Sequence, residues 1–185
     1  MRPAAGEVLH FSEDPTIRRF SPHLAPTTVR TTPYVWAVGH DRAPDYWFPR
    51  QCPRAMAWVG PKTTDADRLR IIGDGSGTRV HAIEYGWLEA IRTVELYAYR
   101  LPAEPFEEAD AAVVATADVE PLGPPERVGD LFELHAEAGI QLRVLPQLHD
   151  FWDAVVGSTL EFSGIRLRNA VPRPAQSSSD DTIGR

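Results

Sequence analysis

Residues 7–15 read EVLHFSEDP, and this stretch sets the pattern for the rest of the chain. Valine, leucine and phenylalanine favour a β-strand over residues 7–11, and the proline ends the stretch. Side chains alternate along a strand, so His10 and Ser12 share one face while Glu13 points to the other. The stretch predicts a short strand that carries an imidazole and a hydroxyl to its end.

Two interpretations of this strand end stay open. An imidazole and a hydroxyl on one face can transfer protons or hold a ribose or a phosphate, which makes His10 a candidate catalytic residue and Ser12 a candidate ligand-binding residue. Alternatively, His10 bonds a backbone carbonyl and Ser12 caps the following turn. Only the position of these side chains relative to a cavity separates the two.

The sequence predicts short strands and short helices along most of the chain. Seventeen prolines and thirteen glycines interrupt it, and both residue types end helices and strands. Apolar alternation predicts further strands at 33–38, 54–59, 68–72, 78–83, 94–101, 111–116, 140–145 and 163–169. Capping and spacing predict short helices at 40–48, 85–91 and 130–138, and one more after Pro146. The strands at 68–72 and 78–83 are predicted to form a hairpin around a glycine-rich turn.

The spacing of these elements indicates the fold class. Connections between several neighbouring strands are too short for a parallel crossover. The sequence therefore predicts the α+β class: a single domain with a mixed, mostly antiparallel β-sheet core and short flanking helices. We predict one globular domain over residues 1–170 and a disordered tail over 171–185, where polar residues and prolines replace the apolar pattern.

Charge and composition narrow the possible partners. The chain has 185 residues, is 43% hydrophobic and 24% charged, and carries a formal net charge of -7, which is typical of a soluble domain and opposes general nucleic-acid binding. No apolar run approaches the roughly 20 residues of a membrane span, and no secretory leader is visible. We expect a cytoplasmic protein that binds a small molecule and no membrane. Its oligomeric state stays open.

Cysteine and histidine spacing argue against a metal site. Cys52 is the single cysteine, so an intrachain disulfide cannot form, and a cysteine-rich zinc site is excluded. The six histidines show neither a helical HxxxH nor an HExxH spacing. Cys52 lies between Arg50 and Arg54, which makes an activated thiol conceivable, but a lone cysteine is more often a small buried apolar residue.

Aromatic side chains and an arginine gather in residues 34–50. Trp36 lies in a predicted strand, Tyr46 in a predicted helix, and Arg50 just after it. Aromatic faces stack on rings, and guanidinium groups bind phosphate or carboxylate. We expect Trp36, Tyr46 and Arg50 to line the wall of a ligand-binding pocket opposite the first strand.

A second acidic and imidazole pair lies at the end of the strand predicted at 78–83. His81 and Glu84 leave this strand on opposite faces or at its end. Glu84 is a candidate general base or a stabiliser of a cationic, sugar-like transition state, and His81 is a candidate ligand-binding residue. The alternative role for Glu84 is to cap the helix predicted at 85–91.

Two arginines in residues 163–169 share one face of a predicted strand. Arg166 and Arg168 stand two positions apart, with Leu167 turned to the other side. Side by side, they can clamp a phosphate or a carboxylate. Alternatively, they protect a solvated strand edge by their charge.

Several stretches resemble a bacterial family known only as a domain of unknown function. They are HFSEDPTIRRFSPH (10–23), YVWAVGHDRAPDYWFPRQCPR (34–54), HAIEYGWLEAIRTVELYAYRLPAEPF (81–106) and STLEFSGIRLRNA (158–170). The resemblance covers nearly the whole chain except its C-terminal tail. It implies membership of that family and names no activity.

More distantly, the order of elements resembles ADP-ribosyltransferase-like proteins. That resemblance implies an ADP-ribosyltransferase-like fold, NAD as the cofactor, and a role for His10 in holding the nicotinamide ribose. Tyr34 or Trp36 matches the aromatic strand, and Tyr46 is placed to stack on a ring. Glu84 corresponds to the acidic residue, although its spacing and context depart from the usual motif.

Three hypotheses of function follow. The first is an NAD-using, ADP-ribosyltransferase-like enzyme that acts on a nucleotide or sugar-phosphate substrate. The second is a non-catalytic domain that binds a nucleotide or another phosphorylated metabolite. The third is an interaction protein whose aromatic stretch around Trp47 and Phe48 meets another chain.

Overall fold

The computed structural model describes residues 1–24, 32–109 and 112–173. Its strands are β1 Glu7–Ser12, β2 Val35–Ala37, β3 Arg54–Trp58, β4 Arg79–Glu84, β5 Tyr97–Pro102, β6 Glu107–Ala109, β7 Ala112–Ala115, β8 Glu126–Arg127, β9 Gln141–Leu145 and β10 Glu161–Ile165. Its α-helices are α1 Asp65–Ile71, α2 Leu88–Thr93, α3 Leu131–Glu137 and α4 His149–Val156. Single 3-10 turns, η1 Ala43–Tyr46, η2 Tyr85–Trp87 and η3 Leu167–Asn169, complete the elements.

The strands form three sheets in the described part of the chain. Their orders are β1-β5-β8, β10-β3-β4-β9 and β2-β7-β6, and every pairing is antiparallel except β4 with β9. An isolated bridge between Leu9 and Val38 joins the first and third sheets. This arrangement confirms the predicted α+β class, a single domain with a mostly antiparallel core and short helices.

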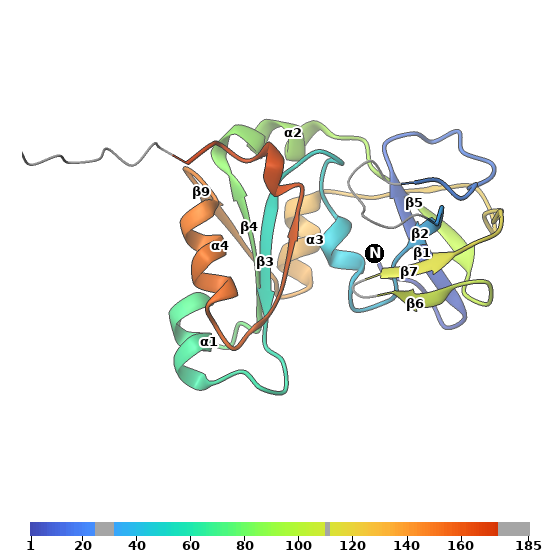
Figure 1. The fold of residues 1–185 in the computed structure, drawn as a ribbon. Helices are drawn as coiled ribbons and strands as arrows, with labels where there is room; N and C mark the ends of the chain where they lie inside the picture. The colour runs from blue at the N-terminus through green and yellow to red at the C-terminus, as the bar shows by residue number, and fades with distance from the viewer. Residues whose placement is uncertain (25–31, 110–111, 174–185) are drawn as a thin grey trace, which may run out of the picture.

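Figure 1 shows two groups of strands side by side. The four-stranded sheet carries α4 and α1 on one side, whereas α3 lies on the other side, toward the group that contains β1, β2 and β5. Alternation along β4 explains this layering, because Val80 and Ala82 pack with the helix-side clusters while Ile83 joins the cluster that includes Trp47 and Phe48. The two faces of one strand therefore serve two different cores.

Residues 68–72 are helical, so the strand predicted there is wrong. Residues 68–71 belong to α1, which follows Thr64 as its N-cap, and Ile72 is its C-cap. The Thr64 Oγ1 accepts a hydrogen bond from the Asp67 backbone N–H at 3.2 Å, and this cap satisfies a donor that a helix start would otherwise leave open. Without a strand at 68–72, β4 pairs with β3 and β9, and the predicted hairpin does not form.

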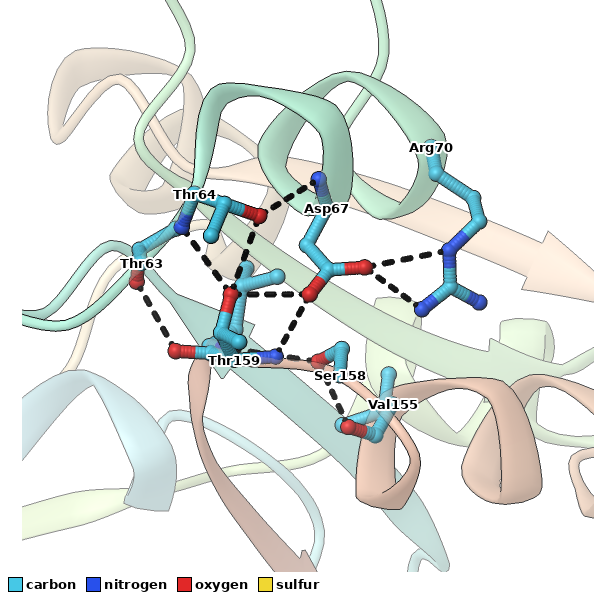
Figure 2. A network of polar contacts seen from close by, with 8 residues as sticks. Thr63, Thr64, Asp67, Arg70, Val155, Ser158 and Thr159 are labelled. Carbon is cyan, nitrogen blue, oxygen red and sulfur yellow. Dashed lines mark hydrogen bonds and ion pairs between the residues drawn. The ribbon is translucent and has the colours of Figure 1, made fainter.

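Figure 2 shows how α1 is tied to the turn that starts β10. The Asp67 carboxylate accepts hydrogen bonds from the backbone N–H and the hydroxyl of Thr159, both at 2.8 Å, and pairs with Arg70. The Thr63 hydroxyl donates to the Thr159 carbonyl at 3.2 Å. Hydrogen bonds from Arg70 and Thr159 lower the pKa of Asp67 to about 2. The start of β10 is thus held, and the opposite end of β10 leads into Arg166 and Arg168.

The remaining predictions differ from the structure at element ends. Residues 163–169 are not one strand, because β10 ends at Ile165 and η3 follows. The strand predicted at 111–116 appears as β7, and residue 111 lies outside the described residues, as does 174–185 of the predicted tail. No helix in the described ranges is long and apolar enough to cross a membrane.

Candidate functional site

An open cavity of about 680 Å³ lies between the β1–β2 side of the molecule and the β3–β10 side. The predicted catalytic residue His10 lines it, and so do most of the predicted ligand-binding residues, although they come from segments far apart in the chain: Ser12, Trp36, Tyr46, Arg50, Arg166 and Arg168. Ligand sites in proteins commonly have volumes of roughly 300–1,000 Å³. The cavity is therefore large enough for a nucleotide-sized molecule.

The wall of this cavity is strongly basic, in a chain whose net charge is -7. Its charged and imidazole side chains are Arg19, Arg50, Arg54, Arg166, Arg168, His10 and His23, against Glu13 as the one lining carboxylate among the described residues. Glu13 lies at the edge, where its Oε1 accepts the Arg50 backbone N–H at 2.8 Å. Positive charge concentrated in a concave surface attracts anions.

Arg54 is the buried cation of the site, with 3% of its surface exposed. It is the first residue of β3 and donates from Nε to the Asp45 carbonyl at 2.7 Å and from Nη1 to the Cys52 carbonyl at 2.9 Å. Its guanidinium lies 5.0 Å from the Phe48 ring centroid. Burial lowers the pKa of Arg54. These contacts hold the side chain in place without neutralising its charge.

Arg166 and Arg168 enter the cavity from the turn after β10. Arg166 has φ 56° and ψ 24°, and it is the only non-glycine residue with positive φ in the described ranges. Its Nε donates to the Arg50 carbonyl at 3.4 Å. Burial lowers the pKa of Arg166, and the charges of Arg168 and Arg50 lower it further. The turn thus brings cations together against their mutual repulsion.

His10 is held as a neutral hydrogen-bond acceptor. Its Nδ1 lies 2.7 Å from the Trp36 carbonyl, and because a carbonyl only accepts, Nδ1 carries the proton and Nε2 keeps its lone pair. Burial lowers the pKa of His10, and its ring packs on Phe20 with centroids 4.5 Å apart. Nε2 can therefore accept a hydrogen bond from a ligand hydroxyl.

Ser12 has both of the roles predicted for it, because it lines the cavity and also caps the following turn. It lines the cavity with 4% of its surface exposed, and its Oγ accepts the Asp14 backbone N–H at 3.1 Å. Tyr46 lines the cavity beside Arg54, with 5.7 Å between the guanidinium and the ring centroid, and burial raises the pKa of its phenol. Both hydroxyls stay protonated and available to a ligand at neutral pH.

Glu84 does not line this cavity. It lies on the face of β4 that also carries Val80 and Ala82, toward α4, and is 2% exposed. Its Oε1 accepts the backbone N–H groups of Leu148 and Val171, both at 3.1 Å, and its Oε2 accepts the latter at 3.0 Å. Glu84 thus caps the start of α4 and anchors the end of the domain, and no substrate can reach it in this arrangement.

His81 is also outside the cavity wall, fully buried behind it. Its Nε2 accepts a hydrogen bond from Arg79 Nε at 2.9 Å, and its Nδ1 lies 3.1 Å from His135 Nε2. Phe48 separates it from the cavity, with 5.7 Å between ring centroids. His81 therefore belongs to the core polar network and has no direct path to a ligand.

Sequence reasoning missed Arg54 as a cavity residue and considered it only as a neighbour of Cys52. A signal was present, because an arginine that opens the otherwise apolar run RAMAW must have a partner or a cavity when the strand is central. Burial raises the pKa of the Cys52 thiol to about 12, so it is not an activated nucleophile. Trp47 and Phe48 are each 2% exposed, so the hypothesis that they anchor another chain is wrong.

Comparisons with known proteins identify a family and little else. A family model described as "Family of unknown function (DUF6886)" matches residues 9–170. No curated protein and no solved structure matches the chain. Among the described residues, no group of three or more His, Cys, Asp or Glu side chains is arranged to hold a metal ion.

Proposed function

We propose that this chain, which belongs to the DUF6886 family, binds a small phosphorylated ligand with a ring, such as a nucleotide, in the arginine-lined cavity. The observation that carries the proposal is the set of arginines on the cavity wall, four of them without a carboxylate partner, with Glu13 as the one lining carboxylate among the described residues. Guanidinium groups bind phosphate through charge-assisted, often bidentate hydrogen bonds. The neighbouring aromatic side chains and the neutral imidazole suit the ring and the sugar of the same ligand.

The absence of carboxylate partners strengthens the proposal. Within the described ranges, no Asp or Glu side chain pairs with Arg50, Arg54, Arg166 or Arg168, whereas Arg42, Arg70, Arg79 and Arg100 all make ion pairs. Bringing like charges together without a counter-ion costs free energy, and a bound anion offsets that cost. Four arginines of the cavity wall therefore carry no carboxylate partner within the described ranges, whereas Arg19 on the same wall pairs with Asp118 and Glu120.

Nucleotide binding tests this proposal. We expect calorimetry with AMP, GMP, ADP-ribose and NAD to detect saturable binding of at least one of them, and the Arg166→Ala/Arg168→Ala variant to bind it about ten- to a hundredfold more weakly, since each lost hydrogen bond involves a charged group. Arg92→Ala removes an exposed arginine outside the cavity and serves as the matched control with unchanged affinity. Absence of heat with every compound would refute the proposal.

An NAD-using, ADP-ribosyltransferase-like enzyme is the second candidate, and His10 is the observation that favours it. Its free Nε2 is suited to accept a hydrogen bond from a ribose hydroxyl beside Trp36. In this candidate Glu13 takes the acidic role first assigned to Glu84, because Glu13 is the carboxylate on the cavity wall. A carboxylate there would stabilise positive charge at the anomeric carbon.

Release of nicotinamide from NAD tests this second candidate. We expect Glu13→Gln to abolish release while NAD binding persists, and His10→Ala to weaken binding itself, because one residue acts on the transition state and the other on the ribose. Glu84→Gln is the comparison, expected to lower the melting temperature through its cap without a specific effect on turnover. If NAD binds and no nicotinamide appears with the unmodified chain, the binding domain is the correct description.

A further inference from the structure

We infer that the cavity is built for a terminal phosphoryl group that carries two negative charges, seated among Arg54, Arg50, Arg166 and Arg168. This inference rests on the proposed function and names the ligand class more closely. Its ligands are phosphomonoesters, such as nucleoside monophosphates or a sugar phosphate. Molecules whose phosphates all lie inside the molecule, bonded on both sides, are expected to bind more weakly, and NAD is one of them.

The depth of Arg54 is the first argument. Arg50 and Arg168 are exposed and Arg166 is half-buried, whereas Arg54 is 3% exposed and lies on the cavity wall. Two of its nitrogens are committed to the carbonyls of Asp45 and Cys52, and its Nη2 has no hydrogen-bond partner among the described residues. A group that reaches a recessed cation must enter the cavity by its end, and a chain that continues past the phosphate on both sides cannot do so easily.

The number of cations is the second argument. Arg166 is close enough to Arg50 and Arg168 for their charges to lower its pKa, and it has the same effect on Arg54. A terminal phosphoryl group offers three acceptor oxygens and nearly two negative charges at neutral pH, whereas a diester offers two free oxygens and one charge. Several guanidinium groups converging on one place therefore match the terminal group better.

The backbone of Arg166 is the third argument. A left-handed conformation costs a side-chain-bearing residue free energy and is ordinarily left to glycine. Here the turn carries an arginine instead. Its Nε donates a hydrogen bond to the Arg50 carbonyl, and its side chain lines the cavity. Such strain persists where the surroundings hold it, and it is frequent at ligand sites. Arg166 thus lines the cavity although its left-handed backbone conformation costs free energy.

The test compares each monoester with the diester made by adding one methyl group to its phosphate. Using the full chain, AMP, GMP, CMP and UMP are titrated by calorimetry at pH 7.5, each beside its methyl phosphodiester. We expect at least one monophosphate to bind about tenfold or more tightly than its diester, because the diester loses one charge and one charge-assisted acceptor. Arg168→Ala, an exposed position, and Arg54→Lys should both reduce this ratio toward one, and Arg92→Ala should leave it unchanged.

A pH series provides a second readout on the unmodified chain. The second ionisation of a phosphomonoester has a pKa near ~6, so the monophosphate should lose affinity between pH 7.5 and pH 5.5 relative to its diester. The diester keeps its single charge over this range and serves as the reference for the monophosphate. Equal affinities for monoester and diester would overturn this inference and leave the proposed function standing. Failure of both series to bind would overturn this inference, and the proposed function falls with it only if ADP-ribose and NAD also give no heat.

Discussion

Replacing Asp45 with alanine is expected to destabilise the fold by about 3–5 kcal/mol, the cost of leaving a buried ion pair without one partner. Asp45 lies in η1 and is fully buried. Its Oδ1 pairs with Arg79 Nη2, and its Oδ2 with Arg42 Nη2 at 2.7 Å. Burial raises the pKa of this carboxyl, and the two arginines oppose that shift.

The loss is large because both arginines would stay where they are. Arg42 and Arg79 each stack on the ring of Trp58, at 4.4 and 4.7 Å from its centroid, and their side chains are 21% and 13% exposed. Without the carboxylate, two cations face each other in a nearly dry site. Unfolding in urea, followed by fluorescence, measures the change in free energy.

Asp41→Ala is the matched control, because it removes the same side chain four positions away where 93% of it is exposed. We expect it to change the free energy of unfolding by no more than about 0.5 kcal/mol. Similar effects of the two substitutions would mean that the buried network contributes nothing particular to stability.

Acidification from pH 7.5 to pH 5.5 is expected to destabilise the protein through His81 and His135, by at most about 1.4 kcal/mol for each of them. The hydrogen bonds determine the protonation of both rings. An arginine N–H only donates, so His81 Nε2 accepts from Arg79, and His81 Nδ1–H donates to His135 Nε2 at 3.1 Å. His135 Nδ1–H then donates to the Leu131 carbonyl at 2.6 Å. Neither ring has a free nitrogen for a second proton.

The sign of this effect follows from the shifted pKa values. Burial lowers the pKa of His81 well below 6.5, and His135 and Arg79 add to the shift; burial also lowers the pKa of His135. Well above pH 6.5 both histidines are neutral in the folded and unfolded chain, so they add no pH dependence there. As the pH falls through about 6.5, the unfolded chain binds protons more readily than the folded chain, and stability falls by at most about 1.4 kcal/mol for each histidine between pH 7.5 and pH 5.5.

Urea unfolding at pH 7.5, 6.5 and 5.5 measures this dependence. We expect His135→Gln to be less stable at pH 7.5 and to lose less stability on acidification than the unmodified chain, since one titrating group is gone while His81 and His10, whose pKa burial also lowers, remain. His40→Gln removes a histidine whose side chain is 63% exposed and should retain the full loss. A chain whose stability is the same at pH 5.5 and 7.5 would show that the buried pair accepts protons when folded.

Much of the fold was predictable because strand alternation is a local property. The strands predicted at 7–11, 54–59, 78–83 and 140–145 correspond to β1, β3, β4 and β9. The prediction failed at 68–72, where a short apolar run suits a strand or a helix equally well. There the Thr64 cap and the contacts of Asp67 with Thr159, about ninety residues later in the chain, select the helix.

The candidate site divides in the same way. Alternation correctly places His10 and Ser12 on one face of β1. Along β4, alternation places His81 and Glu84 on opposite faces, but it does not predict which of the two faces a helix covers. The structure puts α4 over the Glu84 side and a buried network over the His81 side. Neither face of β4 opens to the cavity, and no local pattern carries that information.

The sequence by itself determined the class of fold, the short elements and the kinds of side chain available to a site. Only the tertiary structure decided which arginines would be paired. Arg42 and Arg79 meet Asp45, whereas Arg54 and Arg166 meet each other around an open cavity. The physical reason is range: secondary structure depends on neighbours a few positions away, but an ion pair depends on which segments packing brings within about 4 Å.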